Sequence, residues 1–144
     1  PNSRSINLYP SLCLFEGTDI SIGRGTEYPF QHYGNPYIES NYSFIPISSE
    51  GSKHPKHEGK NCFGTDLRFQ DDYLTEINLR WLIEAYHDYP MKEKFFNNFF
   101  DKLAGTDKLR LEIIAGKNAK DIKRIWKDGL NDFQKIREKY LLYD

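Results

Sequence analysis

The sequence has few cysteines, no long apolar run and almost no net charge, and each of these excludes a class of protein. Its two cysteines, Cys13 and Cys62, are too few for a disulfide framework or a four-ligand zinc site. They either form one disulfide bridge or remain two free thiols. No stretch approaches the ~18 apolar residues that span a bilayer. With 20 Lys and Arg against 21 Asp and Glu, the total charge predicts neither nucleic acid nor a charged membrane as partner.

The length sets the scale of what can fold. A chain of 144 residues fits one domain of ordinary size, and we expect residues 1–144 to form a single domain. The sequence starts at Pro1 without an initiator methionine, which favours a mature product or a piece cut from a longer protein. Aromatic residues make up 15% of the chain, and such side chains either fill a core or stack on sugar rings.

The first half of the sequence predicts a small, loop-rich sheet. Up to about Gln70, glycine, proline, asparagine and serine separate apolar pieces of strand length at residues 19–22, 29–32, 42–47 and 62–69. Residues 9–15 are ambiguous, since the run is short enough for a strand, but Pro10 and Gly17 favour a short helix. We expect these strands to pair in a mixed or antiparallel sheet.

The second half predicts helices. The first runs from a cap at Thr75 to Pro90, and an aromatic helix follows at residues 93–103. A third occupies residues 107–115 between Thr106 and Gly116. The last helix opens with a capping box, Asn118 with Asp121. Its apolar residues form a stripe made of Ile122, Ile125, Trp126, Leu130, Phe133, Ile136 and Tyr140. Gly129 interrupts this helix at a cost of about 1 kcal/mol. The fold class is therefore α+β, with a loop-rich sheet packed against a helical C-terminal half.

The strongest candidate for a site is the glycine-rich segment 16–26. Glu16 ends an apolar run, and partial desolvation of its carboxyl group would suit a general acid. The alternative is a structural carboxylate that accepts from the backbone amides of its own loop. Arg24 lies between two glycines and offers a planar fork of donors for a carboxylate or phosphate ligand. Its alternative is an ion pair with Glu16 or Asp19.

Other patterns carry less chemistry. His54 and His57 lie three residues apart around a proline without further ligands, so we expect no metal site, and no cofactor motif is present. The long polar loop at residues 48–60 is either a binding edge or simply flexible. Basic residues in the last third alternate with acidic ones, which indicates a solvated helix face and no nucleic-acid footprint.

Several segments together resemble one enzyme family. Residues 8–18, from Leu8 to Thr18, are followed by residues 21–26 and 34–37, and further downstream by residues 61–68 and a terminal Tyr-Leu-Leu-Tyr run. In order and spacing these segments are similar to the C-terminal half of the NamZ-type exo-β-N-acetylmuramidases. The resemblance covers nearly the whole chain.

The resemblance implies a function shared between two domains. Such enzymes remove N-acetylmuramic acid from the non-reducing end of peptidoglycan fragments during cell-wall recycling. They are periplasmic or extracellular. An N-terminal Rossmann-like domain carries one catalytic glutamate, and Glu16 would be the second, so this chain alone would hydrolyse nothing. We expect Arg24 to anchor the lactyl carboxylate, with Thr18 and Thr26 as hydroxyl donors to the sugar and His54 on the outer wall.

Two other functions are compatible with the same residues. The chain could be a non-catalytic module that recognises cell-wall carbohydrate through Glu16 and Arg24. It could also be a purely structural interaction domain, which predicts that these two side chains are buried against each other with no cleft beside them.

Overall fold

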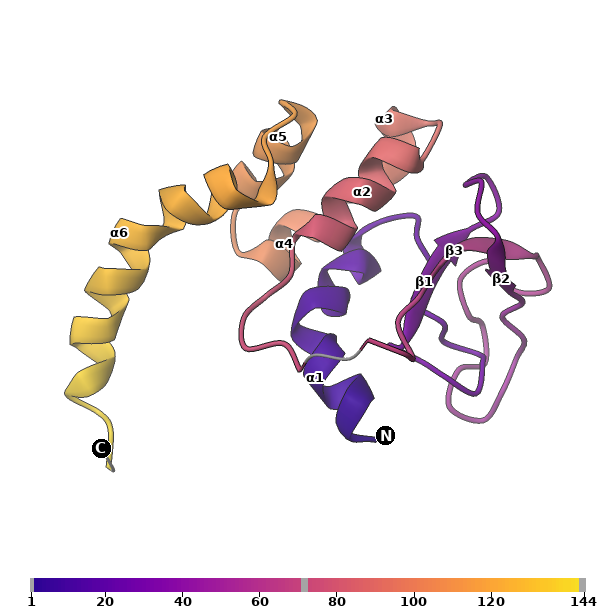
Figure 1. The fold of residues 1–144 in the computed structure, drawn as a ribbon, viewed down its shortest axis with the longest axis horizontal. Helices are drawn as coiled ribbons and strands as arrows, with labels where there is room; N and C mark the ends of the chain where they lie inside the picture. The colour runs from indigo at the N-terminus through magenta and orange to yellow at the C-terminus, as the bar shows by residue number, and fades with distance from the viewer. Residues whose placement is uncertain (1, 71–72, 143–144) are drawn as a thin grey trace.

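A computed structural model describes residues 2–70 and 73–142 and has an α+β architecture, as the sequence predicts. Figure 1 shows a small sheet at one side, a cluster of helices in the middle, and a long C-terminal helix at the other side. The N-terminal helix lies between the sheet and the last helices. The sheet therefore reaches the helical second half largely through this N-terminal segment.

The chain begins with a helix that leads directly into the candidate site. α1 spans Ser3–Leu12, and the side chain of Asn2 caps it by accepting from the amide of Ser5. A 3₁₀ helix, η1 (Cys13–Gly17), continues it without a break. The ambiguous residues 9–15 are thus helical. Leu8, Leu12 and Phe15 are almost fully buried and fix this segment in the core.

Three short strands form an antiparallel sheet in the order β1-β3-β2. They are β1 (His32–Asn35), β2 (Tyr42–Phe44) and β3 (Cys62–Asp66). Tyr33 stacks on Phe15 of η1 at 4.8 Å between ring centroids, whereas its neighbour His32 faces the other side and stacks on Phe44 at 4.0 Å. This alternation is the two-residue period of a strand.

The strand predictions for the first half need correction. Residues 19–22 form no strand, because Ser21 makes only an isolated bridge to Gly34. Residues 29–32 are mostly a turn in which Phe30 takes a positive φ of 60°, so β1 starts at the end of that segment. The other two strands are shorter than expected. Backbone hydrogen bonds between loops also hold this half together, such as the bond from the Ile47 amide to the Gly25 carbonyl at 2.9 Å.

The middle helices also differ from the prediction in their bounds. α2 spans Arg80–Asp88 with Leu79 as its N-cap, so the cap predicted at Thr75 is wrong, although the helix does end before Pro90. The single helix predicted at residues 93–103 is wrong as well. It is two short helices, α3 (Lys92–Phe95) and α4 (Phe100–Ala104), separated by an extended Phe96 that bridges to Thr18.

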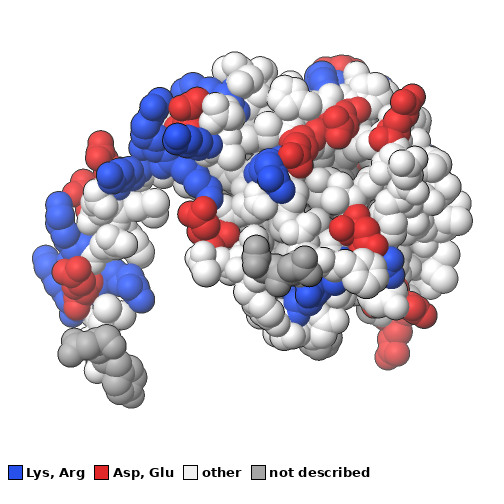
Figure 2. All heavy atoms as spheres, in the orientation of Figure 1, with Lys and Arg blue, Asp and Glu red and all other residues white. Residues whose placement is uncertain are grey.

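The last two helices follow the prediction closely. α5 spans Lys108–Ile114, and α6 spans Ala119–Glu138. The side chain of Asn118 accepts from the Asp121 amide at 3.0 Å, which confirms the predicted start of α6. Figure 2 shows that Lys and Arg are spread along this helix, with acidic groups among them. Both cysteines are free thiols.

Close packing between η1 and α4 fixes the turn that carries Glu16. The Gly17 carbonyl accepts from the Asn97 amide at 2.9 Å, and a Cβ at Gly17 would lie 2.5 Å from the Phe100 Cα. Only glycine allows this approach. The helical half thus holds the glutamate turn from behind.

We expect Gly17→Ala to lower the free energy of unfolding by about 1–3 kcal/mol, because backbone must move to admit the methyl group. Gly129→Ala is the matched control. No atom lies within 4 Å of a Cβ built at Gly129, so alanine should stabilise α6 by up to about 1 kcal/mol. Urea unfolding measures both, and equal effects of the two variants would contradict this packing.

Candidate functional site

Two turns bring the Glu16 and Arg24 side chains together. Glu16 lies in η1, next to the fully buried Phe15, and the Thr18 hydroxyl closes the turn by donating to the Phe15 carbonyl at 2.8 Å. Gly23 and Gly25 then take positive φ values of 74° and 81°. These left-handed positions turn the backbone around Arg24 and aim its side chain back at η1.

The pair itself is close and partly open to solvent. Arg24 donates from Nε and Nη2 to the same oxygen of Glu16, Oε1, at 2.9 and 2.5 Å. The guanidinium also lies over the Phe30 ring, 4.9 Å from its centroid. Side-chain exposure is 28% for Glu16 and 47% for Arg24. The predicted alternative of an ion pair between these two is therefore confirmed, whereas Glu16 accepts no backbone amide of its own loop.

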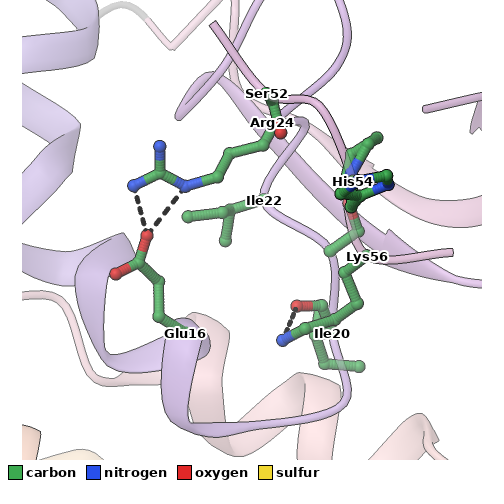
Figure 3. A pocket seen from close by; sticks show the side chains of 9 residues that line it. Glu16, Ile20, Ile22, Arg24, Ser52, His54 and Lys56 are labelled. Atoms are coloured by element: carbon green, nitrogen blue, oxygen red, sulfur yellow. Dashed lines mark hydrogen bonds and ion pairs between the residues drawn. The ribbon is translucent and has the colours of Figure 1, made fainter. Parts of the chain in front are cut away.

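The ion pair forms one end of a pocket of about 250 Å³, shown in Figure 3. Two segments build it: the glycine-rich segment and the long loop at residues 48–60. Apolar side chains form the floor, and polar ones stand around them. The lining is Glu16, Ile20, Ser21, Ile22, Arg24, Ser52, His54, Pro55 and Lys56. Among these, Glu16 is the one carboxylate. A mixed wall of this kind suits a small polar ligand with an apolar face, such as a sugar.

The sequence prediction missed Lys56, which holds the two segments of the pocket together. Its ammonium group reaches the backbone carbonyls of Phe15, Thr18 and Ile20, with distances of 3.4 Å to the first and 3.1 Å to the last. Burial lowers the pKa of this lysine, and the nearby Asp19 and Glu16 charges oppose that shift. A lone lysine in a polar loop carries no signal for this role.

A second set of contacts ties the same loop to the body of the protein. The Asp19 carboxylate accepts from the Tyr89 hydroxyl at 2.7 Å and from the Asn35 amide at 3.0 Å. The His57 ring lies 3.7 Å from the same carboxylate and contacts the Asp19 carbonyl at 2.6 Å. The loop at residues 48–60 is thus anchored at Lys56 and at His57, next to each other in sequence.

The two predicted threonines have structural contacts in this conformation. Thr18 is 1% exposed, and its hydroxyl already donates to the Phe15 carbonyl and accepts from the Ile20 amide. Both of these contacts lie within the turn that carries Glu16. Thr26 is half-buried and donates to the Gly23 carbonyl at 2.7 Å. The structure therefore brings Glu16, Arg24 and His54 together at the pocket, but neither threonine.

His54 lines the pocket at its solvent-exposed side. Its side chain is 93% exposed and lies 3.9 Å from Glu58. His57 points elsewhere, toward Asp19. Within residues 2–70 and 73–142, no group of three potential ligands could hold a metal ion, and no helix is long and apolar enough to cross a membrane.

Comparisons with known proteins identify the family of this chain. The chain belongs to the family described as exo-β-N-acetylmuramidase NamZ, C-terminal, which matches residues 7–143. It is 35% identical to the peptidoglycan β-N-acetylmuramidase NamZ of Bacillus subtilis (strain 168), over 99% of this chain and 38% of that protein.

Two crystal structures of DUF1343 family proteins from Bacteroides fragilis NCTC 9343 share the fold. One has a TM-score of 0.95 at 47% identity, and the other has 0.65 at 20% identity. Both alignments cover all of this chain but only 42% and 43% of those chains. The present chain therefore spans about two fifths of the length of these relatives.

Beside the pocket, His32 bridges the glycine-rich segment and the sheet. Its Nδ1 lies 2.6 Å from the Tyr42 hydroxyl, and its Nε2 lies 3.0 Å from the Thr26 hydroxyl. Burial lowers the pKa of His32 to about 4, and the Arg68 charge adds to this against the opposing effect of Asp66. Burial thus favours the neutral form of this ring in the folded protein.

Because the unfolded chain binds a proton at His32 near pH 6.5 and the folded chain only near pH 4, stability should fall as the pH drops through this interval. Above it, the contribution of His32 is fully present. We expect His32→Gln to flatten this part of the curve of unfolding free energy against pH. The exposed His54 is the matched control, and a curve unchanged in His32→Gln but flattened in His54→Gln would contradict the assignment.

Proposed function

We propose that this chain is the C-terminal domain of a peptidoglycan exo-β-N-acetylmuramidase and contributes half of an active site. The observation that carries the proposal is the Glu16–Arg24 pair at the mouth of a sugar-sized pocket, in a chain that belongs to the NamZ C-terminal family. The name of the Bacillus subtilis relative supplies the substrate class. The substrate is the terminal muramyl sugar of peptidoglycan fragments.

Arg24 is the proposed anchor for the lactyl carboxylate that distinguishes N-acetylmuramic acid from other amino sugars. In the free protein, Arg24 gives two donors to one oxygen of Glu16, and the guanidinium carries five N–H donors in all. An arriving carboxylate can therefore bind Arg24 and weaken its hold on Glu16. Substrate binding would free Glu16 to act as acid, base or charge stabiliser at the glycosidic bond.

Hydrolysis of a glycosidic bond usually takes two carboxylates about 5–10 Å apart. Among the described residues that line the pocket, Glu16 alone supplies one. We therefore propose that the second comes from an N-terminal, Rossmann-like domain of a longer polypeptide, and that residues 1–144 alone are inactive. A second candidate function is a non-catalytic module that binds cell-wall carbohydrate. The presence of one carboxylate in the pocket is also compatible with this function, because binding alone needs no second carboxylate.

The proposed site of action follows from the substrate. Peptidoglycan lies outside the cytoplasmic membrane, so we propose that the enzyme works in the periplasm or outside the cell and serves cell-wall recycling. No cofactor or metal enters this proposal.

In the longer enzyme, Glu16→Gln should lower kcat by about 10²–10⁴-fold, because the amide cannot transfer a proton but keeps the shape of the side chain. Release of N-acetylmuramic acid from a muramyl substrate measures this. The control is Glu39→Gln, an exposed glutamate away from the pocket, which should keep normal kcat. Near-normal kcat in Glu16→Gln would favour the binding module.

Arg24→Ala should raise KM for the muramyl substrate by about tenfold or more, since a charged hydrogen-bonded pair contributes about 1.5–3 kcal/mol. An analogue without the lactyl group should show little difference between Arg24→Ala and the unchanged enzyme. Equal losses for both substrates would remove Arg24 from its role as the carboxylate anchor.

A further inference from the structure

The last helix carries an apolar face that the described part of the chain leaves largely uncovered. Apolar side chains recur every three to four residues along α6, which places them on one side of the helix. The stripe starts in the core at Ile122, which is fully buried. It then continues along side chains that are about half exposed: 47% for Ile125, 54% for Leu130, 59% for Phe133 and 54% for Ile136.

Figure 2 shows that α6 stands away from the rest of the protein beyond its first turns, with a hollow beside it. Phe133 and Ile136 share the helix face of Ile122, the residue that packs into the core. They therefore turn toward the hollow, while charged side chains such as Lys127 and Lys135 cover other sides of the helix. Exposed apolar residues arranged as one stripe, and not scattered, mark an interaction surface.

The relatives contain further chain that this fold lacks. One Bacteroides fragilis structure matches this chain with a TM-score of 0.95 over its whole length. Since α6 is 20 of the 144 residues, a helix in another position would prevent so high a score. The helix therefore keeps its place in a protein of which this chain covers only 42%. More than half of that longer chain is available to fill the hollow.

We propose that the α6 face formed by Ile125, Leu130, Phe133 and Ile136 is the docking surface for the additional part of a longer polypeptide. This rests on the proposed function, which places the chain in a two-domain enzyme. The α6 face shares no residue with the Glu16 pocket. The additional part of the polypeptide would therefore contact this chain at two separate places, the pocket and the α6 face.

The charges around the face describe the matching surface. Along its length α6 carries six basic residues against four acidic ones, namely Lys120, Lys123, Arg124, Lys127, Lys135 and Arg137 against Asp121, Asp128, Asp132 and Glu138. By helical spacing, Lys123 and Lys127 border the face on one side. Asp121, Asp128 and Asp132 border it on the other. The partner surface should therefore be an apolar ridge with one acidic and one basic margin. Two separated attachments would fix the orientation of one domain on the other, and hence the distance between their carboxylates.

The test compares Phe133→Asp in the longer polypeptide and in the 144-residue chain. In the short chain the side chain is exposed, so the thermal midpoint should not fall. In the longer polypeptide it should fall by about 5 °C, because a buried contact is lost. Backbone amides around Phe133 should also exchange about tenfold more slowly in the unchanged longer polypeptide than in the short chain, and this protection should vanish in the variant.

Asn131→Asp is the matched control, since it adds the same charge on the opposite side of α6 and should change neither readout. Equal exchange of these amides in both lengths, or no midpoint shift from Phe133→Asp in the longer polypeptide, overturns the proposal. A dimeric short chain that Phe133→Asp makes monomeric also overturns it, in favour of a second copy. Glu16→Gln should lower kcat by about 10²–10⁴-fold and leave the amide protection intact, so failure of the catalytic proposal would be seen separately.

Discussion

The half-buried Lys56 makes the contacts on which the candidate site depends. It binds backbone carbonyls on both sides of the Glu16 turn, and it belongs to the long loop that forms the opposite wall of the pocket. Asp19 anchors the same loop through the neighbouring His57. Without these contacts the loop would have no fixed distance from Glu16 and Arg24, and the pocket would have one wall.

The sequence predicted the residues at the centre of the site better than the structure around them. The α+β class, the capped start of α6 and the candidates Glu16 and Arg24 all follow from local signals: glycines, caps and apolar periods. The missed parts depend on contacts distant in sequence. The carbonyls that bind Lys56 lie 36 to 41 positions away, and the predicted helix at residues 93–103 breaks where its backbone bonds to the glutamate turn. No local pattern contains such information.

The structure also separates two uses of an acidic and basic pair. A structural pair would be buried with no space beside it, whereas Glu16 and Arg24 remain 28% and 47% exposed and line a pocket. Both partners are satisfied in the free protein, and either can exchange its partner for a ligand group. Under the proposed function this exchange would have a direction, because the lactyl carboxylate of a muramyl substrate would compete with Glu16 for the same guanidinium.

The most direct measurement is an NMR titration of the 144-residue chain that follows the Arg24 side-chain NεH signal and the Gly23 and Gly25 amides. N-acetylmuramic acid should shift these signals, and N-acetylglucosamine, which lacks the lactyl group, should shift them much less. Equal shifts with the two sugars, or shifts confined to residues outside the pocket, would contradict the account that substrate carboxylate takes Arg24 from Glu16.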